Sequence, residues 1–382
     1  MSNTIKLGNF ISEYSVRNRA GDDIPVYSVT NKEGFCRDYF SKDVASQDRS
    51  TYKIVPRGCF AYNPSRINVG SVDWQRKEDK VIVSPLYVVF SVSKGLDQQY
   101  LYYYLKSEKC LYYIKELASG SVRDNLKLSM LKEFTIPIIT LEEQRKAVMV
   151  LEQTDRLIAL QECQMTVLDE LVKSRFIELF GDPEYNDKSW PIHTLGELCS
   201  VGSSKRIYQN EQSTEGVPFW RISDLVSKID TGIVNSELFI PEEKYAELKQ
   251  AELVPNAGDI LVTSRGTLGR CYIIKEDDRF YFQDGMISWV SKYSNGITPL
   301  YLQYLFMMPG IRKQIDSMQA GSTVAYLSIA MLKKLRVMLP DKYMQEQFSA
   351  FVAEVDKSKM AVKQSLEKLE TLKKSLMQQY FG

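Results

Sequence analysis

The amino-acid sequence repeats itself at an offset of 201 residues, and this repeat limits the possible folds more than any other feature. The register holds without a gap from residue 120 to residue 181. Matching positions include Gly120-Ser121 with Gly321-Ser322, Gln144 with Gln345, and Phe180-Gly181 with Phe381-Gly382. Each copy has the length of a domain rather than of a solenoid repeat. The sequence therefore predicts one structural unit present twice.

Each copy begins with a variable part, in which the offset drifts from 188 to 199, as insertions in surface loops would produce. Ser65-Arg66 here matches Ser264-Arg265. We predict two mixed α/β domains at residues 1–131 and 182–331, each followed by a helical segment, at residues 132–181 and 332–382. Alternating runs such as "IPVYSVT" and "DILVTS" are typical of strands.

The helical segments contain no Gly or Pro over residues 141–180 and 341–381, which favours two long helices. Their apolar residues follow the spacing of a coiled-coil seam, interrupted in the second helix by Lys359. The first seam comprises Ala147, Leu151, Thr154, Ile158, Met165, Leu168, Val172, Phe176 and Leu179, and the second Phe348, Val352, Val355, Val362, Leu366, Leu369, Leu376 and Tyr380.

Charge favours pairing of the two helices with each other. Residues 132–181 carry six basic and nine acidic side chains, whereas residues 332–382 carry ten basic and six acidic ones. Opposite net charges attract, so we expect the two helices to pair with each other within the chain. An antiparallel pairing would place Phe381 against the start of the first helix. The alternative is two amphipathic helices, each packed on its own domain.

Polar loops are the candidate functional elements. "YNPSRINVGSV" and "VTSRGTLGRCY" each place Ser-Arg after a strand and before a Gly, which suits phosphate oxygens and the guanine edge. A second pair of loops, "ASGSVRDNLKLS" and "QAGSTVAYLSIA", precedes the helices. Candidate DNA-binding residues are Asn63, Ser65, Arg66, Asn68, Ser121, Arg123, Asn125, Lys205, Arg206, Ser264, Arg265, Thr267, Ser322 and Thr323, with Arg270 as a further basic residue. Ordinary solvated turns would explain the same loops.

Two features argue against a simple nucleic-acid surface. Residues 182–331 carry 14 basic and 19 acidic side chains, so a DNA-binding surface there has to be a local patch. The tyrosines of "QYLYYYLKSEKCLYYIKEL" could stack on bases, but their spacing favours packing against the sheet.

Composition excludes several other classes. The six cysteines form no C-x-x-C pair, and His193 is the only histidine, so we predict no metal, no cofactor and no histidine-based nucleophilic catalysis. The longest apolar run, "VIVSPLYVVFSVS", is too short to span a bilayer, and the N-terminus lacks the pattern of a signal peptide. We expect a cytoplasmic protein.

The repeat, the order of its parts and the helix-start segments "IPIITLEEQRKAV" and "LPDKYMQEQFSAF" resemble the specificity subunit of type I restriction-modification systems. The resemblance implies an α+β fold with pseudo-twofold symmetry, in which an antiparallel coiled coil holds two target-recognition domains apart. It implies that each domain binds one half of a split double-stranded DNA site. It also implies two methyltransferase subunits as partners, a restriction subunit that joins through them, and no catalytic residues in this chain.

Two rival functions fit less well. An adenine methyltransferase needs an Asn/Asp-Pro-Pro-aromatic motif, but "YNPSRI" has Ser65 and Arg66 where the second proline and the aromatic belong. Acidic runs such as "KEDDRF" could serve a nuclease but are typical of solvated turns. A coiled-coil adaptor that does not bind DNA would explain the helices and leave the two duplicated domains without a role.

Overall fold

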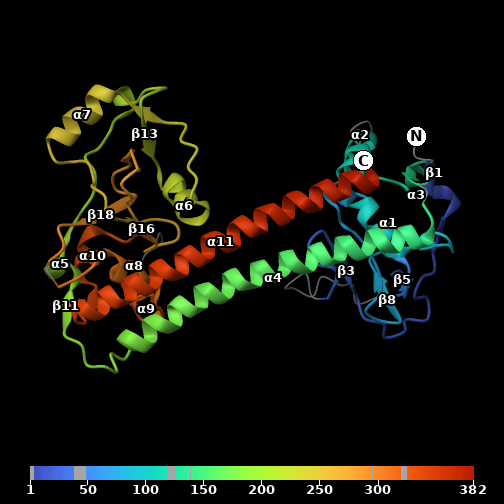
Figure 1. Ribbon diagram of the computed structural model, residues 1–382, viewed down its shortest axis with the longest axis horizontal. Coiled ribbons are helices and arrows are strands. Elements are labelled where there is room, and N and C mark those ends of the chain that lie inside the picture. Colours follow the sequence, from blue (N-terminus) through green and yellow to red (C-terminus); the bar gives the residue numbers. More distant parts are fainter. Residues whose placement is uncertain (1–3, 38–48, 119–124, 138, 295, 320–324) are drawn as a thin grey trace. The chain divides into compact units, whose positions relative to one another are not determined.

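The chain forms two compact units in the computed structural model. Unit 1 comprises residues 1–163 and 362–382, and unit 2 comprises residues 164–361 (Figure 1). The structure describes residues 4–37, 49–118, 125–137, 139–294, 296–319 and 325–382. Among these residues, no helix is both long and apolar enough to cross a membrane.

Unit 1 is built on an antiparallel sheet of four strands in the order β2-β9-β6-β7. These strands are β2 (Ile11–Glu13), β9 (Val88–Val92), β6 (Phe60–Tyr62) and β7 (Val72–Trp74). Smaller pairs are β1 (Thr4–Lys6) with β10 (Thr135–Pro137), β3 (Ser28–Thr30) with β4 (Gly34–Cys36), and β5 (Lys53–Pro56) with β8 (Lys80–Val83). The helices are η1 (Leu7–Asn9), η2 (Ile67–Val69), α1 (Gln98–Leu105), α2 (Glu108–Ala118) and α3 (Leu128–Leu131).

Unit 2 has a corresponding antiparallel sheet in the order β12-β18-β15-β16. These strands are β12 (Ser200–Gly202), β18 (Ile287–Ser291), β15 (Ile260–Thr263) and β16 (Cys271–Ile273). The other strands are β11 (Ile192–Thr194) with β19 (Arg336–Met338), and β13 (Val217–Trp220) between β14 (Phe239–Ile240) and β17 (Tyr281–Phe282). The helices are α5 (Leu195–Leu198), η3 (Gln209–Glu211), α6 (Ile222–Thr231), α7 (Glu242–Gln250), α8 (Pro299–Met307), α9 (Pro309–Met318) and α10 (Ile329–Lys334). The shared strand order confirms the internal repeat.

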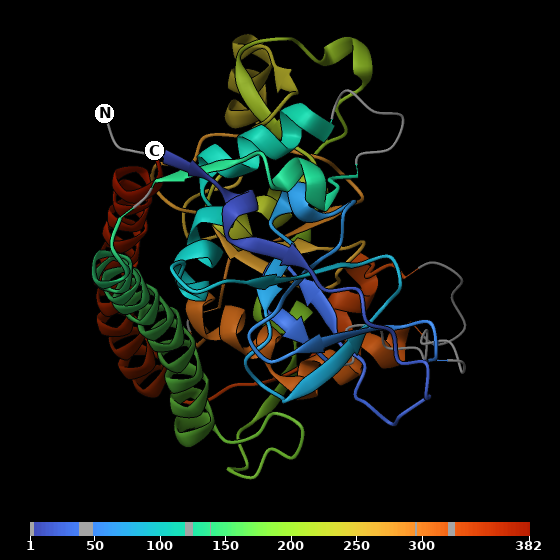
Figure 2. The same ribbon diagram turned by 90° about the vertical axis from the view of Figure 1, so that its right-hand side faces the viewer.

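The two long predicted helices are present as α4 (Leu141–Phe180) and α11 (Lys342–Phe381). An ion pair joins them in each unit, and the later residue of α11 meets the earlier residue of α4, which is the order expected of antiparallel helices. In unit 1, Lys373 lies 2.6 Å from the carboxylate of Asp155, and in unit 2 Lys359 lies 2.6 Å from that of Asp169. Figure 2, which turns unit 1 toward the viewer, shows α4 and α11 side by side. The predicted attraction between the helices is therefore confirmed. Lys359, which interrupts the apolar seam, forms one of these ion pairs.

Every predicted seam residue is buried or half-buried. Unit 2 holds an aromatic cluster at this seam, in which Phe176 stacks on Tyr301 with ring centroids 5.5 Å apart. Phe348 meets Phe176 edge-on at 5.5 Å. Burial of these rings contributes hydrophobic stabilisation where the helices pack on the domain.

Each long helix begins in one unit and ends in the other. Phe381, at the end of α11, packs on Tyr100 of α1 in unit 1, with ring centroids 4.9 Å apart. Phe180, at the end of α4, packs on Tyr301 of α8 in unit 2 at the same distance. Tyr100 and Tyr301 occupy equivalent positions in the repeat. The prediction that Phe381 packs near the start of the first helix is confirmed, because Ala147 belongs to the same buried cluster.

A buried glutamine fastens the start of each long helix to its own domain. In unit 1, Gln144 accepts a hydrogen bond from the backbone N–H of Asp97 (2.8 Å) and donates to the carbonyls of Gly95 (3.1 Å) and Ile139 (3.0 Å). In unit 2, Gln345 makes the equivalent bonds. They join it to Thr298 (2.9 Å), Gly296 (2.8 Å) and Pro340 (2.8 Å). The glutamine of the "LEEQ" segment is thus structural.

Three of the tyrosines in "QYLYYYLKSEKCLYYIKEL" are core residues, as their spacing predicts, whereas Tyr102 is half-buried and Tyr112 and Tyr113 of α2 are exposed. Tyr100, Tyr103 and Tyr104 are buried, and the Tyr104 hydroxyl donates to the carbonyl of Thr135 (3.0 Å). These three side chains are therefore not free to stack on bases.

Candidate nucleic-acid interface

In unit 1, the Ser-Arg loop is a rigid turn that leads from β6 to η2. The side-chain oxygen of Asn63 accepts from the backbone N–H of Ser65 (3.1 Å) and from its hydroxyl (2.9 Å). Ile67 is buried below the loop, and Gly70 has a φ of +84°, a value that favours glycine. Arg66 is exposed and forms no ion pair with any residue that the structure describes. The loop thus presents a free guanidinium on a fixed backbone.

The segment before α3 is tied to this loop. The N–H of Leu126 donates to the carbonyl of Pro64 (3.2 Å), and the hydroxyl of buried Tyr62 donates to the carbonyl of Leu126 (3.1 Å). Burial, followed by the nearby charge of Glu13, raises the pKa of Tyr62, so its hydroxyl stays protonated. These bonds place exposed Asn125 beside the loop that carries Asn63, Ser65, Arg66 and half-buried Asn68.

The corresponding loop of unit 2 connects β15 to β16. The hydroxyl of Thr263 donates to the carbonyl of Thr267 (2.5 Å) and accepts from the N–H of Arg270 (2.9 Å). Arg265 is exposed, forms no ion pair with the described residues, and lies over the ring of Tyr326 at 5.3 Å. The tether seen in unit 1 recurs, because the N–H of Leu327 donates to the carbonyl of Ser264 (2.9 Å). Both loops therefore present one unpaired arginine.

Two candidates in this loop depart from the prediction. Ser264 is only 1% exposed, and its hydroxyl shares a hydrogen bond of 2.8 Å with that of Ser288. The expectation that Ser264 faces DNA is therefore wrong, because the hydroxyl is buried and has a partner within the sheet. Arg270 forms a bidentate ion pair with Asp230 of α6. The hydrogen bond to Asp230 raises the pKa of Arg270. The guanidinium of Arg270 therefore already has an acidic partner within unit 2.

Lys205 and Arg206 lie on a loop beside the turn between β17 and β18. Arg206 pairs with Asp284 at 2.9 Å, and Lys205 lies 4.0 Å from Glu247. Both basic side chains are more than half exposed. The same turn adjoins the Ser-Arg loop, since the N–H of Ser264 donates to the carbonyl of Met286 (2.9 Å). The structure thus brings the two predicted basic regions of unit 2 to one turn, with Arg206 already neutralised by its partner.

Four of the candidate residues lie outside the described residues. They are Ser121, Arg123, Ser322 and Thr323. Their roles stay predictions.

The sequence does not predict that the β3–β4 hairpin lies next to the Arg66 loop, with a cavity between them. The cavity has a volume of about 450 Å³ and is lined by Asn63 and Arg66 on one side and by the β3–β4 hairpin on the other. The available signal was the stretch "VYSVTNKEGFC", in which two strand-like runs flank a turn that ends in glycine. Among the described residues, no group of three or more His, Cys, Asp or Glu side chains could hold a metal ion.

The fold and the paired loops define a class of protein with two units that share a four-stranded antiparallel sheet and an arginine loop, and that are connected by two long helices. Solved structures share this fold. A chain from a study of complex assembly and conformational transition of the type I R-M system aligns over 99% of this chain and 97% of its own, with a TM-score of 0.60 and 15% identity. The type I restriction-modification S subunit of M. genitalium aligns over 100% and 96%, with a TM-score of 0.55 and 17% identity.

Sequence comparisons identify the family. The type I restriction modification DNA specificity domain matches residues 6–168 and 187–372, and the chain belongs to this family. A putative type I restriction enzyme specificity subunit from Haemophilus influenzae is 27% identical over 66% of this chain and 62% of its own length. The MjaIX specificity subunit from Methanocaldococcus jannaschii is 26% identical over 68% and 62%. The chain thus spans less than two thirds of the length of these relatives.

Proposed function

We propose that this chain is the sequence-recognition subunit of a type I restriction-modification complex. Residues 1–131 and 182–331 each bind one half of a split double-stranded DNA site. Residues 132–181 and 332–382 join them and set the gap between the half-sites. The observation that carries this proposal is the matched pair of rigid loops, each of which presents an unpaired arginine, in a chain of the DNA specificity domain family. Arginine binds phosphates and, through two donors, the guanine edge.

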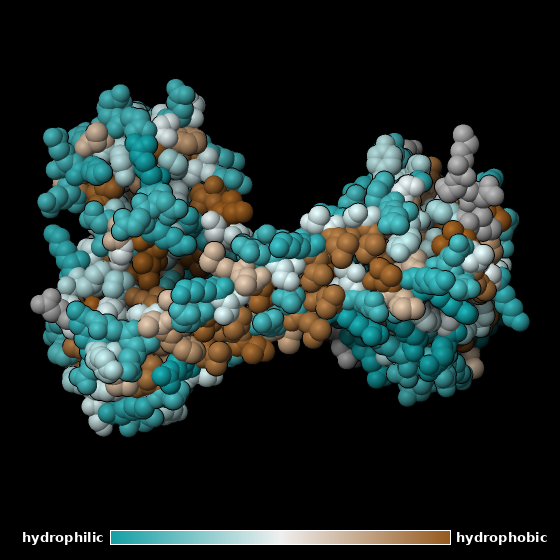
Figure 3. Space-filling model, viewed as in Figure 1, coloured by the Kyte–Doolittle hydropathy of each residue, from teal (hydrophilic) through white to brown (hydrophobic). Residues whose placement is uncertain are grey.

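The helices dock two methyltransferase subunits in this proposal. The outward side of α4 carries large apolar residues that are about half exposed, including Leu157 and Leu160 in unit 1 and Val167 and Leu171 in unit 2. Figure 3 shows hydrophobic residues gathered over the long helices. Exposed apolar stripes of this kind are typical of surfaces that a partner covers. A restriction subunit joins through the methyltransferases, and the complex acts on DNA in the cytoplasm.

The chain itself is non-catalytic in this proposal, and the adenine chemistry belongs to the partners. The rival function, a coiled-coil adaptor without sequence-specific DNA binding, is not favoured. It assigns no role to the two polar loops, which are fixed by side-chain hydrogen bonds yet leave Arg66 and Arg265 unpaired among the described residues.

Mapping N6-methyladenine in the DNA of cells that express this chain with its methyltransferase tests the function. We expect a split motif that is methylated only when both proteins are present. Arg66→Ala should relax one position of one half-site and Arg265→Ala one position of the other, each by about 1–3 kcal/mol.

Arg57→Ala is the matched control, because Arg57 is exposed but pairs with Asp79 at 3.3 Å on another turn of unit 1. Its motif should equal that of the unchanged chain. The function is wrong if no adenine methylation depends on the chain. The assignment of the two arginines is wrong if both variants keep the full motif and affinity.

A further inference from the structure

The β3–β4 hairpin of unit 1 forms a second polar wall beside the Arg66 loop. Its tip consists of Asn31, Lys32 and Glu33, all exposed, and all three line the cavity of about 450 Å³ that Asn63 and Arg66 line from the other side. Lys32 and Glu33 form no ion pair with any residue that the structure describes. Their charged groups are therefore available to a ligand in the cavity.

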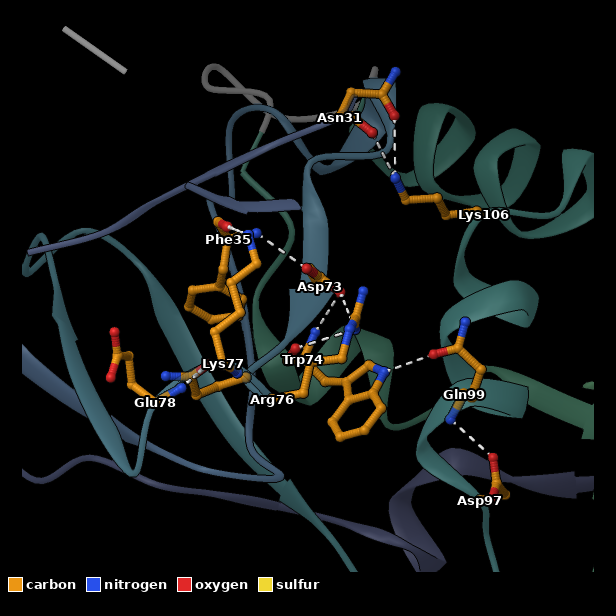
Figure 4. A network of polar contacts seen from close by, with 11 residues as sticks. Asn31, Phe35, Asp73, Trp74, Arg76, Lys77, Glu78, Asp97, Gln99 and Lys106 are labelled. Atoms are coloured by element: carbon orange, nitrogen blue, oxygen red, sulfur yellow. Dashed lines mark hydrogen bonds and ion pairs between the residues drawn. The ribbon is translucent and has the colours of Figure 1, made fainter. Parts of the chain in front are cut away.

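The tip of the hairpin is held firmly against the body of unit 1. Lys106, which follows α1, donates to the backbone carbonyl of Asn31 (2.7 Å) and approaches its side-chain oxygen (3.4 Å), as Figure 4 shows. On the opposite side, a Cβ added to Gly70 would lie 2.7 Å from the side-chain oxygen of Asn31. The hairpin tip and the Arg66 loop thus touch at Gly70, and their relative position is fixed.

Buried Asp73 fixes the base of the hairpin. Its carboxylate accepts from the backbone N–H of Phe35 (3.0 Å), from the N–H of Trp74 (2.8 Å) and from the guanidinium of Arg76 (3.0 Å). Figure 4 shows this carboxylate at the centre of the network. A Cβ at Gly34 would lie 2.0 Å from the same carboxylate, so the hairpin packs directly on it. A wall held at both ends can orient side chains without a large loss of entropy on binding.

Unit 2 builds the corresponding wall from a different element. After β13 its chain enters α6, and Asp230 of α6 pairs with Arg270. By the 199-residue offset that aligns the two loops, Arg270 takes the place of Ser71, which lines the cavity in unit 1. The two units thus share the arginine loop and differ in what faces it, as expected of two units that bind different half-sites.

We propose that the β3–β4 hairpin tip is a second DNA-reading element of unit 1, with Glu33 as a specificity-determining residue opposite Arg66. This inference rests on the proposed function and adds to it a named element and a class of base contact. A carboxylate is repelled by phosphates, so it is unfavourable at a DNA surface unless a donor meets it. The donors that duplex DNA offers in the major groove are the amino groups of cytosine and adenine. Glu33 accepts a hydrogen bond from one of these, and Lys32 supports the contact from a neighbouring phosphate or base acceptor.

The test is the N6-methyladenine profile produced by variants of the full chain with its methyltransferase. Glu33→Ala should relax one position of the half-site that Arg66→Ala also affects, by about 5- to 150-fold in discrimination. The other half-site should be unchanged. Glu33→Gln keeps the size and one acceptor of the side chain, so it should keep part of the preference at that position.

Glu13→Ala is the control, because this substitution removes the same charge from another exposed position of unit 1. Glu13 does not line the cavity. If Glu33→Ala gives the same profile as Glu13→Ala while Arg66→Ala relaxes its half-site, the inference about the hairpin is overturned and the proposed function stands. If the unchanged chain directs no split-motif methylation, the proposed function fails first.

Discussion

Replacing Phe176 by alanine is expected to destabilise unit 2 by about 3–5 kcal/mol, because the ring is fully buried in the aromatic cluster of the seam. It contacts Phe180 (4.9 Å between centroids), Tyr301 and Phe348 (both 5.5 Å). Truncation leaves a cavity that these large rings cannot readily fill. Amide hydrogen exchange of the full chain measures the effect, with faster exchange expected in peptides of unit 2 than in those of unit 1.

The neighbouring Ile177 is the matched control for this variant. Ile177 is 39% exposed on the same turn of α4, so Ile177→Ala should cost far less. The equivalent of Phe176 in the other copy is Met377, which is only half-buried. Met377→Ala should therefore destabilise unit 1, and by less than Phe176→Ala destabilises unit 2. Equal losses of protection for Phe176→Ala and Ile177→Ala would contradict the assignment of Phe176 as an anchor of the seam.

The parts of the fold that the sequence predicts well are those with a strict period. The helices α4 and α11 and their seam follow from apolar spacing, because a long helix that lacks Gly and Pro has few alternatives. Their attraction follows from net charge and is seen in the contact of Lys373 with Asp155. The direction of pairing does not follow from spacing or charge. The family resemblance implies antiparallel pairing, and this places Phe381 near the start of α4.

The candidate site was harder to predict because it depends on contacts between distant segments. Arg66 and Arg265 lie on exposed loops, as the sequence predicts. The burial of Ser264 could not be foreseen, since its partner Ser288 comes from another strand. The pairing of Arg270 with Asp230 likewise needs α6, a helix far from Arg270 in the sequence. Local sequence fixes a turn, but tertiary contacts decide which of its side chains remain free.

The resemblance to a family rested partly on the glutamine of "LEEQ" and "MQEQ", and the structure gives that residue a physical role. Gln144 and Gln345 are 3% and 0% exposed. Each uses its amide oxygen and its amide nitrogen at once, which only an amide side chain can do at this position. Gln345 receives the N–H and hydroxyl of Thr298 and gives both its protons to carbonyls.

Replacing Gln345 by glutamate is therefore expected to cost about 3 kcal/mol or more at neutral pH. In the unchanged chain the amide nitrogen of Gln345 lies 2.8 Å from the carbonyl oxygens of both Gly296 and Pro340. The new carboxylate keeps the acceptor for Thr298 but places a buried negative charge against these two carbonyl oxygens. Both carbonyls also lose their donor, which is costly in a buried site. Urea denaturation of the full chain should show a lower midpoint for the transition of unit 2.

Gln347→Glu provides the matched control, because it makes the same chemical change two residues further along α11 at an exposed position. Its midpoint should lie close to that of the unchanged chain. Gln144→Glu should repeat the large effect, this time in unit 1, since Gln144 donates to two carbonyls in the same way. If Gln345→Glu and Gln347→Glu were equally stable, the glutamine would not fasten the helix. If only one of the two buried glutamines proved sensitive, the repeat would share its geometry without sharing the way in which its helices are held.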